Sequence, residues 1–136
     1  MRFVDDGEPW SAVRLREEIR SMTSAYEQHG YGVWPVLFKE TGVIVGACGL
    51  RQFADTSQIE LIWVFARAHW GQGYAFEAAT AVLDFGLREI PQKRAIATAD
   101  REDARSIRLI NRLGMRYEGI VRAYRRDLMQ YVVETT

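Results

Sequence analysis

The 136-residue chain has little of several features that would assign it to a special class. Cys48 is its one cysteine, so no disulfide can form within the chain, and a reducing, cytoplasmic setting is expected. His29 and His69 stand too isolated to predict a metal site. Lys+Arg and Asp+Glu number 18 each, and this zero net charge argues against nucleic acid as a partner. No apolar run approaches the ~20 residues that span a membrane, and no signal peptide opens the chain.

What is present indicates one globular domain over residues 1–136, with 48% hydrophobic and 26% charged residues. Periodicity and turn residues predict an α+β fold, a mixed sheet covered by helices. Pro35 cannot donate to a strand ladder, so its strand is expected at a sheet edge. After an irregular segment at 1–10, we expect helices at 12–29, 74–90 and 104–113, and strands at 33–40, 43–53, 59–65, 94–99, 115–124 and 126–135.

Residues 59–90 have the pattern of a strand, a short loop and a helix. Ile59–Phe65 is rich in β-branched and aromatic residues, and helical apolar spacing begins at Tyr74. Gly71 and Gly73 therefore lie just before a helix N-terminus, where unpaired backbone N–H groups and the helix dipole favour a phosphate. Gly73 lacks a Cβ and allows close approach. A plain tight turn explains the two glycines equally well, since neither a third glycine nor Gly-Lys-Ser/Thr follows.

The wider context of this loop resembles a known family. The segment Trp70-Gly71-Gln72-Gly73-Tyr74-Ala75-Phe76-Glu77-Ala78 is similar to the acetyl-CoA pyrophosphate loop of the GNAT N-acetyltransferase superfamily, Gln/Arg-x-x-Gly-x-Gly/Ala. Trp70 takes the Gln/Arg position, Gly73 the central glycine and Ala75 the last position. Tryptophan followed by Gly-x-Gly-Tyr-Ala resembles the branch that contains the ribosomal-protein N-terminal acetyltransferases (RimJ/RimL-like).

A second motif extends the resemblance over most of the chain. Asp103–Met115, followed by Tyr117-Glu118-Gly119, is similar to the family's Asn-x-x-Ser…Leu-Gly-Phe…Glu-Gly. The resemblance implies the GNAT fold, a mixed, largely antiparallel sheet with helices on both faces. We expect an N-terminally shortened version, because the strand and helix that usually open the family have no counterpart. A second copy of the chain would then cover the sheet edge at Pro35.

Three positions depart from the family pattern. The family's asparagine is Asp103 here, and its phenylalanine after Leu-Gly is Met115. Ile110 stands where some relatives carry a tyrosine general acid. An ionised aspartate can only accept hydrogen bonds, so Asp103 would weaken the hold on an anionic cofactor. These departures leave two alternatives to an enzyme, namely a non-catalytic acyl-CoA-binding or assembly module, or a piece of a longer enzyme.

The resemblance also implies which residues bind acetyl-CoA. The backbone of Gln72, Gly73, Tyr74 and Ala75 would hold the pyrophosphate, with Gly71 shaping the turn and Arg67 within sequence reach of a phosphate. The segment Trp63-Val64-Phe65 would pair with the pantetheine arm, and a backbone N–H there would polarise the thioester carbonyl. Plain core packing remains the alternative for Trp63.

The resemblance implies catalytic roles for Glu60 and Ser106. Glu60 is the candidate general base, because desolvation in an apolar strand can raise the pKa of a carboxyl and some GNAT enzymes use such a glutamate through a water. An exposed strand-end glutamate is the alternative. Ser106 resembles the serine that protonates the departing thiolate, or else it only hydrogen-bonds near the helix start. Asp103 is a second cofactor-side residue that could also cap this helix.

The resemblance implies an N-acetyltransferase that moves an acetyl group directly from acetyl-CoA, its co-substrate, to a primary amine. The acceptor would be a protein N-terminal α-amine or a small amine metabolite. Cys48 has no activating base beside it in the sequence, so a covalent acetyl-enzyme is not expected.

Overall fold

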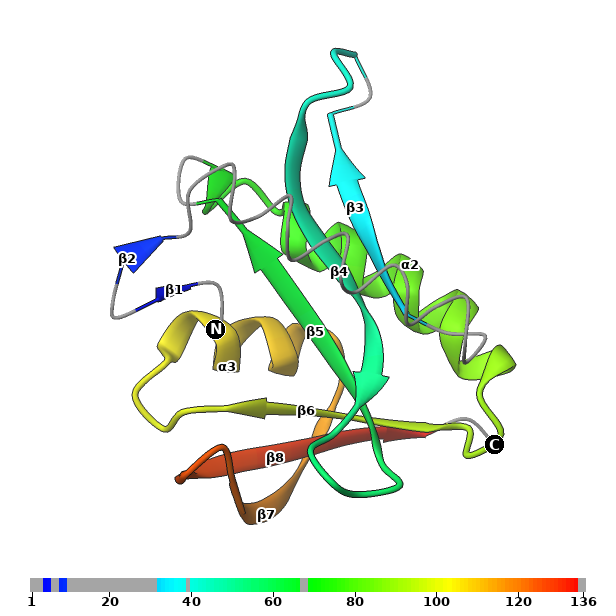
Figure 1. Cartoon of the computed structure of the whole chain (residues 1–136), viewed down its shortest axis with the longest axis vertical. Helices are drawn as coiled ribbons and strands as arrows, with labels where there is room; N and C mark the ends of the chain where they lie inside the picture. The colour runs from blue at the N-terminus through cyan, green and yellow to red at the C-terminus, as the bar shows by residue number, and fades with distance from the viewer. Residues whose placement is uncertain (1–3, 6–7, 10–31, 39, 67–68, 135–136) are drawn as a thin grey trace.

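The computed structural model of the chain describes residues 4–5, 8–9, 32–38, 40–66 and 69–134. The helix expected at 12–29 lies outside these residues. Figure 1 shows a curved sheet with two helices beside it. The elements are β1 (Val4–Asp5), β2 (Glu8–Pro9), β3 (Val33–Leu37), β4 (Ile44–Gln52), β5 (Ile59–Phe65), α2 (Tyr74–Glu89), β6 (Arg94–Ala99), α3 (Ala104–Arg112), β7 (Arg116–Ala123) and β8 (Arg126–Glu134).

Six strands form one sheet in the order β3-β4-β5-β6-β8-β7. Only the β5–β6 pair is parallel, and the chain crosses between these two strands through α2. The mixed, largely antiparallel α+β fold is thus confirmed. β3 is an edge strand of this sheet, as expected from Pro35, which pairs with Ala47.

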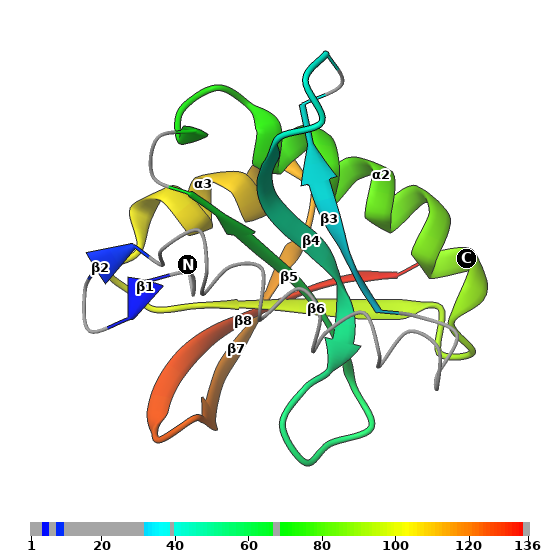
Figure 2. The same ribbon diagram turned by 45° about the horizontal axis from the view of Figure 1, so that its top comes forward.

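Both described helices pack on one face of the sheet. Ala79, Leu83 and Leu87 of α2 and Ile110 of α3 join one buried cluster with alternate strand residues such as Ala95, Ala97 and Ala99. Residues in between, such as Ile62 and Ile96, face the other way and belong to two smaller clusters. Figure 2 shows α2 and α3 lying side by side along this face. The expectation of helices on both faces therefore rests on residues outside the described part.

The sheet opens between its two parallel strands. All seven residues of β5 pair in register with β4, but β5 and β6 are in register only at Glu60 and Ile96. Both views show the strands diverging from there towards the end of β5 (Figures 1 and 2). Beyond this pair the edge of β5 that faces β6 is out of register with that strand.

Two local expectations are corrected. Residues 1–10, expected to be irregular, contain a short antiparallel ribbon in which Asp5 pairs with Glu8. The sequence between the two paired strands is an Asp-Gly dipeptide, which favours a short hairpin over an irregular segment. The strand expected to reach residue 40 ends at Leu37, because the register shifts there and Phe38 closes a turn with Val43 through a 2.9 Å backbone hydrogen bond. Gly114 has φ 79°, as expected of a residue that ends α3.

Candidate functional site

The loop before α2 has the backbone geometry expected of an anion-binding turn. Gly71 and Gly73 have φ 76° and 80°, in the left-handed region that glycine tolerates. Gly73 is the N-cap of α2, and among the described residues no side chain caps this helix end. A Cβ placed on Gly73 would meet nothing within 4 Å, so its exposed side is open. The exposed backbone of Gly73 therefore lies at the N-terminus of α2, where the positive end of the helix dipole favours an anion.

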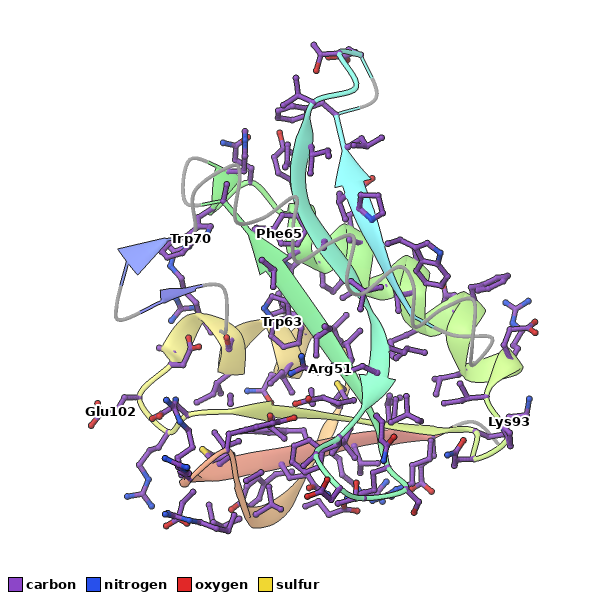
Figure 3. The ribbon with its side chains drawn as sticks, in the orientation of Figure 1. Arg51, Trp63, Phe65, Trp70, Lys93 and Glu102 are labelled. Carbon is purple, nitrogen blue, oxygen red and sulfur yellow. The ribbon has the colours of Figure 1, made fainter. Side chains whose placement is uncertain are left out.

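Trp70 ties this loop to the end of β5. Its indole Nε1–H donates to the Phe65 carbonyl over 3.0 Å. Figure 3 shows Trp63 and Phe65 along β5, with Trp70 beyond the end of the strand on the side of α3. Arg105 of α3 places its guanidinium carbon 5.0 Å from the Trp70 ring centre, a cation–π contact. The tryptophan thereby joins the strand end, the loop and α3.

A second arginine of α3 lies against the first turn of α2. Arg112 stacks on Phe76 at 4.0 Å and lines a groove of about 390 Å³ between α2 and α3. Seven positions separate Arg105 and Arg112, so they share one face of α3. Among the described residues neither guanidinium has a carboxylate partner. Sequence reasoning missed both arginines, although their seven-residue spacing on a helix after the loop is a usable signal.

Asp103 and Ser106 form a closed pair at the start of α3. Asp103 is the N-cap, and it accepts hydrogen bonds from the Ser106 backbone N–H (3.1 Å) and hydroxyl (2.7 Å). Burial raises the pKa of the Asp103 carboxyl, but hydrogen bonds, including those from Ser106, outweigh it and hold the pKa below its usual value. Capping is therefore one confirmed role of Asp103. The role of Ser106 towards a thiolate stays a prediction.

Glu60 lies on the face of the sheet opposite α2 and α3 and is 1% exposed, so the alternative of an exposed strand-end glutamate is wrong. Thr98 donates its hydroxyl to one carboxylate oxygen over 2.6 Å, and Arg51 approaches the other at 3.5 Å. Arg51 is its register partner on β4, and Figure 3 shows this side chain near the start of β5. Glu60 is thus buried with polar partners at the point where β5 leaves β6.

The segment Trp63–Phe65 is buried and lies in the part of β5 that is out of register with β6. Trp63 and Phe65 pack into the large cluster beneath α2, so core packing holds for the Trp63 side chain. Val64 faces the other side with Ile62 and Ala47. The backbone role predicted for this segment does not conflict with that packing, because its edge towards β6 lies beyond the last registered pair.

The other residues singled out from the sequence show no catalytic arrangement. Cys48 is buried, and desolvation raises the pKa of its thiol to about 12. His69 packs against Phe38 with ring centres 5.2 Å apart, and Tyr74 packs against Phe38 at 5.3 Å. Within the described ranges no cluster of three or more His, Cys, Asp or Glu side chains suits a metal, and no helix is long and apolar enough to cross a membrane. Arg67 and His29 lie outside those ranges.

Comparison with known proteins identifies the family. Residues 1–116 match the acetyltransferase (GNAT) domain. The chain belongs to the GNAT acetyltransferase family. It is 37% identical over 108 residues to the uncharacterized protein YkkB of Bacillus subtilis (strain 168), covering 76% of this chain and 63% of YkkB. It is 32% identical over 90 residues to the uncharacterized N-acetyltransferase p20 of Bacillus licheniformis, covering 65% of this chain. The chain thus spans less than two thirds of both, 63% and 51% of their lengths.

Solved structures share the fold. An acetyltransferase from Agrobacterium tumefaciens str. C58 superposes with a TM-score of 0.78 at 21% identity, covering 96% of this chain and 76% of that one. YncA of Salmonella typhimurium, a putative acetyltransferase solved with its cofactor acetyl-CoA, gives 0.68 at 21%, covering 82% and 68%. A putative ribosomal-protein-serine acetyltransferase from Vibrio cholerae gives 0.74 at 20%, covering 93% and 76%.

Proposed function

We propose that this GNAT domain transfers an acetyl group from acetyl-CoA to a primary amine. One observation carries the proposal: α2 begins at left-handed Gly73, in the loop that follows β5, and β5 itself is in register with β6 only near its start, at Glu60. A helix start that suits a phosphate and a strand edge for an acyl arm would therefore follow one another along the chain. The acetyl-CoA held by the YncA structure on the same fold supports this assignment.

The described residues suit the cofactor along its length. Backbone N–H groups of Gln72–Ala75 would bind the pyrophosphate, and Gly71 shapes their turn. Arg105 and Arg112, unpaired with any described carboxylate, would add positive charge on the α3 side. The pantetheine arm would run along Trp63–Phe65, where a backbone N–H would polarise the thioester carbonyl.

Transfer needs a neutral amine and a protonated leaving group. Glu60 would take the proton of the ammonium, directly or through a water, as general base. The amine nitrogen then forms the new bond to the thioester carbon while the carbon–sulfur bond breaks, and the thiolate receives a proton. Ser106 would supply or relay that proton after its hydroxyl turns away from Asp103, to which it now donates over 2.7 Å.

The acceptor would be a protein N-terminal α-amine or a small amine metabolite. Likeness to the Vibrio cholerae enzyme and the Trp70-Gly71-Gln72-Gly73-Tyr74-Ala75 loop support the RimJ/RimL-like branch and hence the first. A cytoplasmic setting and a homodimer covering the β3 edge belong to the same proposal. Leu37, on that edge, and Val43, just before β4, are each about half exposed (50% and 51%), which supports a covering partner.

A non-catalytic acyl-CoA-binding module is the second candidate. Ile110, at the position of the tyrosine general acid in some relatives, is 0% exposed and sits in the core. The Ser106 hydroxyl is also engaged by Asp103. Turnover of any amine excludes this candidate, whereas tight acetyl-CoA binding without turnover over a broad amine panel would favour it.

Calorimetric titration with acetyl-CoA tests the cofactor site, using Gly73→Glu as the decisive variant. Glutamate there would add a negative charge at the pyrophosphate, and binding should weaken at least about 100-fold. Gly73→Ala adds the backbone strain alone, because a Cβ there meets open space. Gly42→Glu is the matched control: Gly42 has φ 73° with equally open surroundings and lies in the turn between β3 and β4.

Micromolar binding that is lost in Gly73→Glu but kept in Gly42→Glu is the expected result. If folded wild-type protein binds no acetyl-CoA, the transferase proposal fails for this chain. If both glutamate variants bind like the wild type, the cofactor does not use this loop.

A further inference from the structure

Arg51 is a cation that the fold uses only in part. One guanidinium nitrogen meets Glu60 at 3.5 Å, which is long for a charge-assisted hydrogen bond. Its Nε is buried and has no hydrogen-bond partner among the described residues, yet 36% of the side chain is exposed. A planar guanidinium offers five N–H donors, so Arg51 keeps most of its capacity to bind a carboxylate.

A buried acceptor atom lies on the same face, two strands away from Glu60. Gln130 of β8 is the register partner of Thr98 on β6, and Thr98 donates to Glu60. The Gln130 amide nitrogen donates to Glu118 over 2.7 Å, but its buried Oε1 has no partner among the described residues. An unused donor and an unused acceptor therefore flank the Glu60 carboxylate. Leaving such groups unpaired is unfavourable, so a ligand that carries both an anionic acceptor and a cationic N–H donor would stabilise them.

We propose that the acceptor carries a carboxylate beside its amine, as a free α-amino acid does. Arg51 would bind the carboxylate through its fork of N–H groups, while the amine faces Glu60. This inference rests on the proposed acetyl transfer and names its substrate class. Of the two acceptors proposed above it selects the small amine metabolite, because the α-amine of a protein N-terminus stands beside a neutral peptide carbonyl. In such a zwitterion the ammonium and the carboxylate are bonded to one carbon. Each can therefore face the protein group of opposite charge, the ammonium towards Glu60 and the carboxylate towards Arg51. A phosphate in place of the carboxylate would bring a second negative charge next to Glu60.

The reaction balances with these groups. The ammonium gives its proton to Glu60, and the resulting amine attacks the thioester carbon. The carbon–nitrogen bond forms, the carbon–sulfur bond breaks, and the thiolate takes up a proton to give free CoA and the N-acetyl amino acid. Arg51 takes no part in these bond changes. It is a specificity residue that orients the acceptor.

Steady-state acetylation of matched acceptors tests the proposal. The panel holds several amino acids of different side-chain size, each with its carboxamide, and isopropylamine as an amine with neither group. We expect kcat/KM for each free acid to exceed that for its amide about 10- to 100-fold, the range of a charge-assisted hydrogen-bond pair. The α-amine of the amide is less basic than that of the free acid, so more of it is neutral at a given pH. Intrinsic reactivity alone would therefore favour the amide.

Variants of Arg51 test whether this side chain causes the preference for free acids over amides. In Arg51→Gln the acids and amides should fall within about threefold of each other, and in Arg51→Lys the preference should be intermediate, since the charge remains without the fork. Arg122→Gln is the control, because Arg122 pairs with Asp127 at an exposed hairpin. Circular dichroism and the Kd for acetyl-CoA report whether each variant is folded. If Arg51→Gln does not fold, Arg51→Lys and the wild-type panel carry the test.

Two results overturn the proposal: a wild-type enzyme that accepts amides and isopropylamine as readily as the acids, or a folded Arg51→Gln that keeps the acid preference. Absence of turnover with every amine, with acetyl-CoA bound, contradicts the transferase activity instead. In that case, titration of L-alanine and its amide into the CoA-bound protein decides the carboxylate preference, and equal or absent binding refutes it.

Discussion

Charged side chains are arranged in opposite ways on the two faces of the sheet around β5. On the α2–α3 face, Arg105 and Arg112 stack on aromatic rings and have no carboxylate partner among the described residues. On the other face, Glu60 is buried with Thr98 and Arg51 as polar partners. The first face leaves its positive charge available to a ligand, whereas the second face buries its carboxylate within the protein.

This difference suits a reaction with two unlike substrates. A polyanionic cofactor gains from exposed, uncompensated cations and from the open N-terminus of α2. Proton removal from an amine needs a carboxylate whose position is fixed by neighbours before the substrate arrives. In the proposed transfer β5 would serve both, because its alternate side chains point to the two faces and its end is out of register with β6.

Glu60→Gln, on the face of the sheet opposite α2 and α3, should have the largest effect on turnover. We expect kcat to fall about 100-fold, as for loss of a general base, with the Kd for acetyl-CoA unchanged. In urea denaturation the free energy of unfolding should also fall by about 1–3 kcal/mol, since Arg51 loses its charged partner. Glu118→Gln is the control, as Glu118 also accepts from an arginine but lies on β7. A kcat within threefold of wild type would make Glu60 purely structural.

Arg105→Gln, on the α2–α3 face, should weaken acetyl-CoA binding, which is a smaller effect. The Kd for acetyl-CoA should rise about tenfold, the value of one charge-assisted contact to a phosphate. The affinity of the wild type should fall more steeply with salt than that of the variant, because a screened charge has been removed. Arg122→Gln, at the exposed β7–β8 hairpin, should match the wild type. An unchanged Kd in Arg105→Gln would leave the arginine with a packing role on Trp70.

Local pattern was enough to predict much of this arrangement. β5 and β6 have the predicted bounds, because each is an apolar run limited by turn residues. The start of α2 follows from two glycines before helical spacing. The contacts of Glu60 with Arg51 and Thr98 were beyond reach, since they depend on which strands become neighbours and in what register. The same holds for Arg105 on Trp70, which depends on how α3 docks.

Substitution of Cys48 should have no effect on activity near neutral pH, because its buried thiol takes no part in the proposed chemistry. Its thiol pKa of about 12, against an ordinary 9.0, means that the folded protein keeps the proton where the unfolded chain loses it. Stability from this group is therefore complete below pH 9 and declines as the pH rises from about 9 towards 12. Cys48→Ala should lack that decline and keep kcat within twofold. Rapid thiol labelling of the native protein at pH 8, before unfolding, would contradict this and reopen a covalent acetyl-enzyme.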